Sequence, residues 1–407
     1  MENGEVHVMG NIYDVAVLGG GILGTSAAMA LLRKDTPSLI ILEEEKKLAF
    51  HQSGRNSGVV HAGIYYLPGS LKARFCTLGR EALYRFCSKE GIPYDICGKL
   101  VVAANEREET LLQGLEDRGR QNGLTGHSML SRSQMKGHEP QVSGRCALLV
   151  PQTGIVDFSL VTRTFGRIVS GLGGEIRLGT ALRSVEKKEG VLSLSTNKGE
   201  VRCRFMVNCG GLFSDRIARM YGASVPMRII PFRGEYYRLK GSARNMVSRL
   251  VYPVPDPDLP FLGVHLTKMI DGEILAGPNA VLATSRKGYK WSDFSLRDTR
   301  DILGYRGFWR LAARHSSIGL GEIYRSLRKE AFLASLRKLL PHIEMNHLEP
   351  APSGVRGQAV SPEGRLVDDF VILEDERAIH VLNAPSPAAT SSIPIGEHIA
   401  EKILERL

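Results

Sequence analysis

A glycine-rich turn near the start of the chain has the residue types and the spacing that bind a dinucleotide. Gly19, Gly21 and Gly24 form the pattern G-x-G-x-x-G. The first glycine of such a pattern permits a tight turn, the second lets the backbone approach a pyrophosphate, and the third lets a helix pack closely on a strand. The free N–H groups at the start of that helix, here at Ile22 and Leu23, bind the phosphates.

An acidic residue stands where the ribose of such a dinucleotide is held. Glu43 follows Gly24 by 19 residues and ends a short apolar run. Its carboxylate can accept hydrogen bonds from ribose hydroxyls and would repel a 2′-phosphate, which disfavours NADP. A glycine turn beside a surface glutamate is the alternative. The pattern does not separate NAD from FAD, but its place at the beginning of the chain, with a strand and a helix at the other end, favours FAD.

Two further segments supply groups that suit FAD. A polar loop follows the second apolar run, and its amides and hydroxyls suit the diphosphate or the ribityl chain. The contacts expected in it are Ser53, Arg55, Asn56, Ser57 and Gly58. A small-residue turn precedes the last helix, whose positive N-terminus would stabilise an anionic reduced flavin. The contacts expected there are Ser386, Ala388, Ala389 and Thr390, and Gly210 is expected near the pyrophosphate. A surface turn and a plain strand–helix connection are the alternatives.

The elements that must position these residues follow from the apolar pattern. Tyr13–Leu18 and Ser38–Leu42 are predicted strands on either side of a helix over Ile22–Leu32. The middle of the chain predicts a strand at Cys203–Cys209 and then an antiparallel sheet. The strands of that sheet are expected at Met227–Leu239, Leu250–Tyr252, Leu262–Leu266 and Glu273–Ala276. Residues 293–340 have helical periodicity, and a strand (Ala378–Leu382) and a helix (Ile393–Leu407) end the chain.

This order predicts an α/β fold in which both ends of the chain build one domain. We expect a Rossmann-like FAD-binding domain from residues 11–90, 150–225 and 350–407. A substrate-binding domain built on an antiparallel β-sheet plus helices is inserted into it, from residues 91–149 and 226–349.

Composition excludes several classes of protein. The 407 residues are 43% hydrophobic and 24% charged, which is typical of a globular protein and not of a disordered or fibrous one. The six cysteines form no CxxC pair, so we expect reduced thiols and a cytoplasmic protein. No apolar run is long enough to span a membrane, and the first residues do not resemble a secretory signal. No histidines have metal-site spacing, so no metal is expected.

Long and unusual segments then point to a family. They include FHQSGRNSGVVHAGIYYLPGSLKARFC from Phe50, CGKLVVA from Cys97, PFRGEYYRL from Pro231, YPVPDPDLPFLGVHLT from Tyr252, GPNAVLA from Gly277, GVRGQAVSPEG from Gly354 and NAPSPAATSS from Asn383. Together they resemble the L-2-hydroxyglutarate dehydrogenase/oxidase family, FAD-dependent oxidoreductases of the D-amino-acid oxidase and glycine oxidase type. The sequence departs from the family pattern G-H-N-S-G at Arg55. The resemblance implies noncovalent FAD, L-2-hydroxyglutarate as the substrate and 2-oxoglutarate as the product.

Oxidation of a 2-hydroxy acid needs a base for the hydroxyl proton and anchors for carboxylates, while flavin takes the hydride. His61 is the expected base, because a histidine that titrates near neutrality is suited to this task. Arg356 and Arg233, each beside a glycine, are the expected carboxylate anchors. Weaker candidates for the substrate pocket are Tyr65, Lys99, Tyr236, Tyr252 and His265. A structural or orienting role for His61 and ordinary salt bridges for the arginines are the alternatives.

The positive charge of the chain is concentrated in one stretch. Residues 285–341 hold 13 Lys and Arg against 5 Asp and Glu, a net charge of +8, together with both tryptophans. A basic amphipathic helix of this kind can lie on an anionic membrane. A solvated helical face is the alternative, and no nucleic-acid-binding module is recognisable. The family resemblance implies a peripheral attachment in bacterial members, on the inner face of the cell membrane, with quinone or another carrier as the electron acceptor.

Two other functions remain open on the sequence. An amine or amino-acid oxidase of the same fold, similar to glycine or sarcosine oxidase, would be reduced by an amino acid instead of a hydroxy acid. A non-catalytic flavin-binding scaffold would bind flavin without being reduced by a substrate. Reduction of the bound flavin by a panel of substrates separates all three.

Overall fold

A mixed sheet at one end of the molecule is built from both ends and the middle of the chain. The computed structural model describes residues 11–257 and 262–407. The strands run in the order β10-β11-β12-β1-β2-β9, with β20 beside β12 and β19 beside β20. They are β1 (Ile12–Leu18), β2 (Leu39–Leu42), β9 (Glu175–Arg177), β10 (Leu182–Lys188), β11 (Val191–Thr196), β12 (Gly199–Asn208), β19 (Val371–Asp375) and β20 (Ala378–Asn383). Because β1 pairs in parallel with β2 and β12, the predicted strand–helix–strand unit is confirmed.

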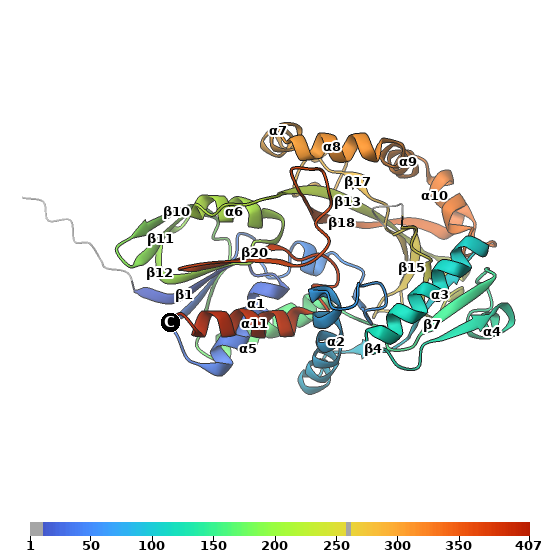
Figure 1. The fold of residues 1–407 in the computed structure, drawn as a ribbon, viewed down its shortest axis with the longest axis horizontal. Helices are drawn as coiled ribbons and strands as arrows, with labels where there is room; N and C mark the ends of the chain where they lie inside the picture. Colours follow the sequence, from blue (N-terminus) through green and yellow to red (C-terminus); the bar gives the residue numbers. More distant parts are fainter. Residues whose placement is uncertain (1–10, 258–261) are drawn as a thin grey trace, which may run out of the picture.

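Helices cover both faces of this first sheet (Figure 1). On one face α1 (Ile22–Lys34), α5 (Phe158–Gly171) and α11 (Ser392–Leu404) bury Val15 and Val17 of β1. On the other, the β10–β11 hairpin and α6 (Ser214–Tyr221) cover Ala16 and Leu18. The long α2 (Leu71–Glu90) packs against α11. This arrangement brings the C-terminal helix beside the helix that follows the glycine-rich turn.

The second sheet forms the other lobe. Its order is β17-β13-β16-β15-β14-β5-β7-β6, with β18 beside β13. Its strands are β5 (Lys99–Ala103), β6 (Ser128–Ser131), β7 (Cys146–Val150), β13 (Arg228–Leu239), β14 (Leu250–Pro253), β15 (His265–Lys268), β16 (Ile274–Gly277), β17 (Val281–Leu282) and β18 (Leu348–Val360). Every pair in it is antiparallel except β5 with β14. The predicted antiparallel sheet is therefore confirmed.

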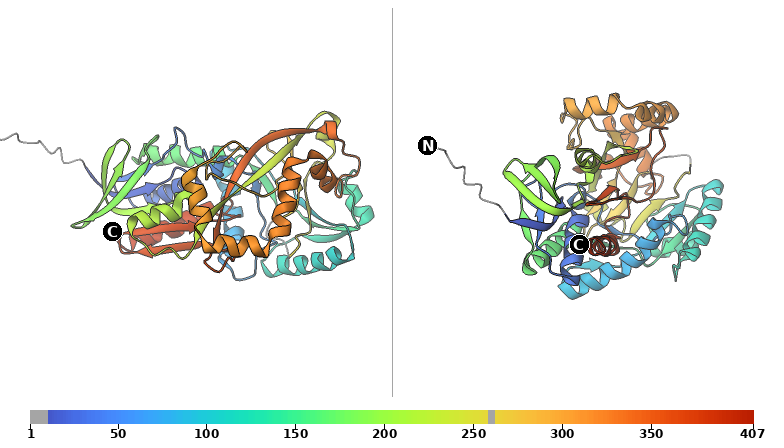
Figure 2. Two further views of the ribbon diagram at one scale, coloured as in Figure 1. Left: turned by 90° about the horizontal axis from the view of Figure 1, so that it is seen from above. Right: turned by 60° about the vertical axis from the view of Figure 1, so that its left-hand side comes forward.

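The remaining elements surround the second sheet and connect the lobes. They are α3 (Glu106–Gln121), α4 (Arg132–His138), α7 (Leu296–Leu303), α8 (Arg306–Arg314), α9 (Ser316–Leu327), α10 (Lys329–Leu336) and the small sheet of β3 (Val59–Val60), β4 (Tyr94–Asp95) and β8 (Gly154–Val156). In Figure 2 the helices α7 to α9 run as a separate layer over the edge of the second sheet. The helical periodicity of residues 293–340 corresponds to α7–α10.

The structure differs from the expected domain boundaries at β18. Residues 348–360 pair with β13 along almost its whole length, so residues 350–360, expected in the FAD-binding domain, hydrogen-bond within the second sheet. The residues of β18, many of them apolar or small, pair with those of β13. The chain returns to the first sheet only at β19 and β20. The long strand thus connects the two lobes.

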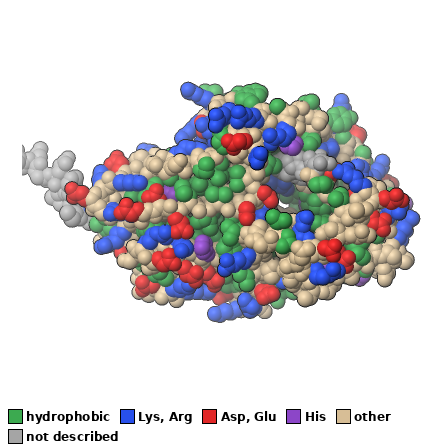
Figure 3. Space-filling model, in the orientation of Figure 1, with side chains coloured by type: hydrophobic (Ala, Val, Ile, Leu, Met, Phe, Trp, Pro, Cys, Tyr) green, Lys and Arg blue, Asp and Glu red, His purple; other side chains and the backbone are tan. Residues whose placement is uncertain are grey.

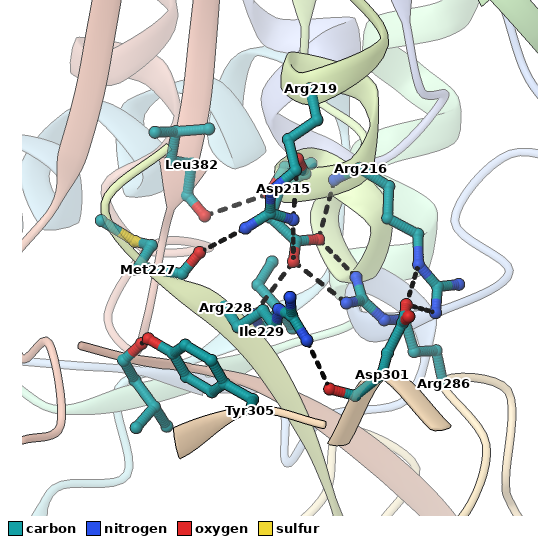
Figure 4. Close-up of polar contacts among 12 residues, drawn as sticks. Asp215, Arg216, Arg219, Met227, Arg228, Ile229, Arg286, Asp301, Tyr305 and Leu382 are labelled. Carbon is teal, nitrogen blue, oxygen red and sulfur yellow. Dashed lines mark hydrogen bonds and ion pairs between the residues drawn. The ribbon is translucent and has the colours of Figure 1, made fainter. Parts of the chain in front are cut away.

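A buried ion-pair network fastens α6 to the segment before α7 (Figure 4). The carboxylate of Asp215 is fully buried and accepts from the Arg286 guanidinium, from Arg219 and from the Ile229 N–H. Burial acts to raise the pKa of Asp215, but the hydrogen bonds and charge of Arg286 hold it below its usual value. Arg216 reaches Asp298 and Asp301 of α7. Several cations near the basic stretch therefore hold the lobes together.

Candidate active site

Only one side of the glycine-rich turn has space for a cofactor. Gly19 has a φ of +109°, and a Cβ there would lie 2.5 Å from the Cys209 carbonyl oxygen. A Cβ on Gly24 would lie 2.0 Å from the Gly19 carbonyl oxygen. Gly21 differs, because its Cβ would meet only the Ser53 hydroxyl, at 3.2 Å. Since Gly21 precedes α1 without a side-chain cap, its open side lies at the start of α1, where a pyrophosphate fits.

Glu43 lies beside this turn as expected. Its Oε2 accepts from the Gly20 N–H at 2.6 Å and its Oε1 from the Glu45 N–H at 2.7 Å. Burial is the main reason why the pKa of Glu43 is raised, and the two N–H donors oppose that effect. Each carboxylate oxygen can accept more than one hydrogen bond, so the fixed carboxyl group can also receive ribose hydroxyls. Gly210, which follows β12, stands close to Gly19 through the Cys209 carbonyl.

The polar loop joins the first lobe to the second. Ser53 Oγ accepts from the Ile22 N–H at 2.9 Å, which places the loop over the start of α1. Asn56 bonds the Ser53 carbonyl and the Gly58 N–H, which closes the loop on itself. Arg55 points elsewhere: it donates to the Phe50 and Ser353 carbonyls and stacks 3.9 Å from the Tyr289 ring centroid. The structure therefore brings Ser53 to the glycine-rich turn and directs Arg55 toward β18; no polar contact of Ser57 is found among the described residues.

His61 lies where the loop after β3 meets the C-terminal turn. The backbone N–H of His61 donates to Thr390 Oγ1, and the ring Nε2 lies 3.2 Å from Ser386 Oγ. Its Nδ1 is buried and has no hydrogen-bond partner among the described residues. The burial of the ring, and then the charge of Lys99, hold the pKa of His61 well below its usual value. The ring is therefore neutral and has one nitrogen available to a ligand.

The C-terminal turn was expected to contact FAD, and in the structure two of its residues also contact His61. Thr390 and Ser386 hold His61 from two sides. Ala388 and Ala389 pack into the core of the first lobe. The hydroxyls of Ser391 and Ser392, at the start of α11, are buried without partners in the described part of the chain. Donors without partners at the positive end of a helix fit an anionic or carbonyl-bearing ring.

One face of the second sheet carries a group of polar side chains over His61. The ammonium of Lys99 lies 4.7 Å from the ring centroid of Tyr65 and 4.6 Å from that of Tyr252. The Tyr252 ring stacks on His265 at 4.0 Å between centroids. Burial lowers the pKa of His265 to about 3, and the positive charges of Arg356 and Lys99 contribute. His61, Lys99 and Arg356 thus share one electrostatic environment.

Tyr236 and Arg356 complete this group from β13 and β18. Burial raises the pKa of Tyr236, and the neighbouring Arg356 guanidinium opposes that effect. Thr267 was not among the sequence candidates, yet its buried hydroxyl lies near Tyr252 and has no hydrogen-bond partner among the described residues. Its position two residues after His265 on one strand was the available signal, since residues i and i+2 share a face.

Arg233 does not join the group around His61. It bonds Glu235 and the Lys290 carbonyl and stacks on Trp291, and it lines a cavity of about 570 Å³ together with Arg55, Tyr236 and Tyr289. The strand register explains the difference. Arg356 is opposite Phe232, whereas Arg233 is opposite Val355, so the two arginines leave the β13–β18 pair on opposite faces. Of the two anchors expected from sequence, the structure brings only Arg356 to the candidate site.

The site has no obvious place for a metal. Among residues 11–257 and 262–407, no three His, Cys, Asp or Glu side chains form a group that could hold an ion. In this part of the chain the titratable groups nearest His61 are cations and tyrosines instead of carboxylates. The donor set therefore suits an organic cofactor and an anionic ligand.

Comparison with known proteins decides the family. The model of the FAD dependent oxidoreductase family matches residues 14–402. The chain is 45% identical over 394 residues to L-2-hydroxyglutarate dehydrogenase of Escherichia coli K12, covering 96% of this chain and 93% of that one. The human protein named L-2-hydroxyglutarate dehydrogenase, mitochondrial, is 42% identical over 412 residues, covering 97% and 89%. This chain belongs to the L-2-hydroxyglutarate dehydrogenase family of FAD-dependent oxidoreductases.

Solved structures of other members of the fold agree. L-α-glycerophosphate oxidase of Mycoplasma pneumoniae, solved with FAD bound, has a TM-score of 0.78 and 21% identity, covering 97% of this chain and 95% of that one. Glycine oxidase of Geobacillus kaustophilus has a TM-score of 0.75 and 16% identity, covering 98% and 96%. These likenesses establish the fold. The L-2-hydroxyglutarate dehydrogenase family uses FAD, and the open cradle at Gly21, beside Glu43 and the start of α1, fits that cofactor.

Proposed function

We propose that this protein oxidises L-2-hydroxyglutarate to 2-oxoglutarate with FAD. The observation that carries the proposal is the neutral, half-buried His61, whose Nδ1 has no partner among the described residues, in a group of side chains that also includes Arg356 and Lys99. A base and cations are what a hydroxy dicarboxylate requires. The names of relatives that are 42–45% identical over nearly the whole chain support this substrate and its L configuration.

Each side chain then has a definite task. With the ring proton of His61 on Nε2 and donated to Ser386 Oγ, the Nδ1 lone pair accepts the proton of the substrate hydroxyl. Arg356, which neighbours Tyr236, binds a substrate carboxylate through its planar fork of donors. Residues of the glycine-rich turn, Glu43 and the loop at Ser53 would hold FAD, which supplies a two-electron acceptor when bound. The sheet above His61 excludes water from the reacting carbon.

Anaerobic reduction of the bound flavin tests this function. Addition of L-2-hydroxyglutarate to the purified holoenzyme without oxygen should bleach the flavin absorption, and equimolar 2-oxoglutarate should form. D-2-hydroxyglutarate, glycine and sarcosine are the comparison substrates. Bleaching by glycine or sarcosine instead would establish the amine-oxidase alternative, and bleaching by none of the four would contradict the proposal.

We further propose that electrons leave to a quinone at an anionic membrane surface on which the protein lies peripherally, on its inner face. In α9, Leu320, Ile323, Tyr324 and Leu327 recur at helical spacing and are 38–68% exposed. No residue of α9 is buried, so this apolar face has no partner within the described chain. Trp309 of α8 is 55% exposed nearby in sequence.

The charge around this apolar face suits anionic lipid. The exposed cations of α8 and of the segment after α9 are Arg306, Arg310, Arg314 and Arg328. Figure 3 shows hydrophobic and basic side chains together along the upper edge, over the position of α7 to α9 in Figure 1. None of the described helices is long and apolar enough to cross a membrane. An amphipathic basic surface of this kind binds in the headgroup region instead.

A variant of this surface tests the attachment. L320E combined with Y324E should lower binding to vesicles of phosphatidylcholine and phosphatidylglycerol by about 10-fold or more, because each buried apolar side chain contributes about 1.5–3 kcal/mol. Quinone reduction in those vesicles should fall equally, while reduction of a soluble dye should be unchanged. L407E, at an exposed leucine outside this surface, is the control. Equal vesicle binding by the variant, or a wild-type dimer that the variant dissociates without any vesicle binding, would contradict this proposal.

A further inference from the structure

Lys99 is an unusual buried cation. Five Lys and Arg side chains are buried among the described residues, and Lys99 is the least exposed of them at 1%. The other four contact a carboxylate: Lys72 with Asp368, Arg80 with Glu81, Arg233 with Glu235 and Arg286 with Asp215. The Lys99 ammonium has no ion pair or hydrogen bond within residues 11–257 and 262–407; it lies beside the rings of Tyr65 and Tyr252.

Burial of an ammonium without a neighbouring anion is unfavourable in free energy, so its presence at this position requires an explanation. Transfer of a charge from water into a protein interior is unfavourable unless the charge is paired and hydrogen-bonded. Two tyrosine faces recover part of this free energy. They leave the N–H donors of the ammonium without acceptors. An anionic ligand would supply both the missing charge and the missing acceptors.

The position of Lys99 determines which part of a ligand it can reach. It begins β5, and its charge acts on His61 and His265, while Arg356 acts on His265 from β18. Two residues before Arg356, a Cβ on Gly354 would lie 2.4 Å from the Arg55 carbonyl oxygen, in the loop expected to hold FAD. Arg356 therefore stands near the loop expected to hold FAD. Lys99 lies instead between the rings of Tyr65 and Tyr252.

We propose that Lys99 binds the carboxylate of the substrate that lies farther from the reacting carbon, and thereby selects dicarboxylic over monocarboxylic 2-hydroxy acids. This inference rests on the proposed function and deepens it. Arg356 holds the carboxylate next to the hydroxyl-bearing carbon, and His61 accepts the hydroxyl proton. A ligand without the second carboxylate leaves the Lys99 ammonium desolvated and unpaired, so it binds more weakly.

The protonation of Lys99 supports this arrangement. Burial is the main cause that lowers the pKa of Lys99 to about 7. The titratable groups that face it are Tyr65, Tyr252, Cys76, Cys97, His61 and His265, and no carboxylate in the described chain is among them. Above pH 7 the free amine is therefore mostly neutral, and binding of a carboxylate raises its pKa again. Dicarboxylate binding at pH 8 should take up close to one proton, and binding at pH 6 should take up less.

The test compares a dicarboxylate with its monocarboxylic analogue. In K99M the kcat/KM for L-2-hydroxyglutarate should fall about 10²–10³-fold, because the partner of a buried charge is lost. The kcat/KM for L-2-hydroxypentanoate, which lacks the second carboxylate, should change less than about 3-fold. K268M removes a lysine of the same sheet that pairs with Asp95, and it should leave both values unchanged. Loss of an unpaired buried charge should also raise the Tm of K99M or leave it unchanged.

A binding measurement without turnover separates this inference from the proposed function. Calorimetry of the oxidised holoenzyme with glutarate should give proton uptake at pH 8 in the wild type and none in K99M, with glutarate affinity lower by about 10²-fold. If no 2-hydroxy acid reduces the flavin, the proposed function fails, although glutarate binding still tests Lys99. If L-2-hydroxyglutarate is oxidised and K99M keeps the wild-type preference for the dicarboxylate, or if R356M rather than K99M loses that preference, the assignment of Lys99 is overturned.

Discussion

Replacement of His61 by asparagine should leave the purified protein yellow and lower flavin reduction by L-2-hydroxyglutarate by about 10²–10⁴-fold, the usual contribution of a positioned base. Asparagine can still donate to Ser386 Oγ, but it cannot accept the hydroxyl proton. The measurement is the rate of anaerobic flavin bleaching in stopped flow. H342N, which changes an exposed histidine, is the control and should react at the wild-type rate. A rate for H61N within about 3-fold of the wild type would contradict the assignment of His61 as the base.

The pH dependence gives a second test of His61. Burial and then the charge of Lys99 hold its pKa well below the usual value of 6.5. The ring must be neutral to accept a proton, so a lowered pKa keeps the base active on the acidic side of neutrality. The kcat/KM of the wild type should therefore show no decrease as pH falls through 6.5 and should decrease only at lower pH. H61N should lack that acidic decrease, and a decrease in both proteins at the same pH would show that another group causes it.

Replacement of Gly21 by valine should abolish FAD binding while the chain still folds. The backbone at Gly21, with φ −79° and ψ 178°, is extended and allowed for any residue. The added Cβ would meet only the Ser53 hydroxyl, at 3.2 Å, and the rest of the side chain would occupy the space in which a pyrophosphate fits. Purified G21V should be colourless and inactive, and its affinity for added FAD should fall by about 10³-fold or more, in line with the steric exclusion of the phosphates.

The control for Gly21 lies three residues further along the chain. A Cβ on Gly24 would collide with the Gly19 carbonyl, so G24V should lose soluble, folded protein as well as colour. For G21V, far-ultraviolet circular dichroism should match that of the flavin-free wild type, and its Tm should lie within a few degrees of that form. A yellow G21V protein with wild-type activity would contradict the placement of the cofactor at this turn.

Local sequence was sufficient for the parts of the site that lie close together along the chain. The glycine-rich turn, the helix after it and Glu43 fall within 25 residues of one another, and the spacing of Gly19, Gly21 and Gly24 restricts the backbone directly. The predicted strands and helix agree with β1, β2 and α1 to within about two residues, because each is a short apolar run bounded by glycine or charged residues. Four of the nine strands that the structure describes in the second sheet, β13 to β16, were predicted for the same reason.

Only the tertiary structure decided which of the expected residues meet. Arg233 and Arg356 have similar surroundings in the sequence, and the register of β13 against β18 places them on opposite faces of the strand pair, so that only Arg233 lines the cavity of about 570 Å³. The side chain of Arg55, which was expected to bind FAD, likewise points toward β18 and stacks on Tyr289. Side-chain direction depends on a pairing between strands that are more than 100 residues apart, and no local pattern encodes it.

The sequence by itself therefore determined the family, the cofactor cradle and the residue types of the site, because these depend on short-range backbone constraints and on long shared motifs. The tertiary structure decided that Lys99 is buried without an anion, that Ser386 holds His61, and that the apolar face of α9 is exposed. These properties depend on what surrounds a side chain in three dimensions. Burial, charge pairing and the free side of a helix are set by segments distant in sequence.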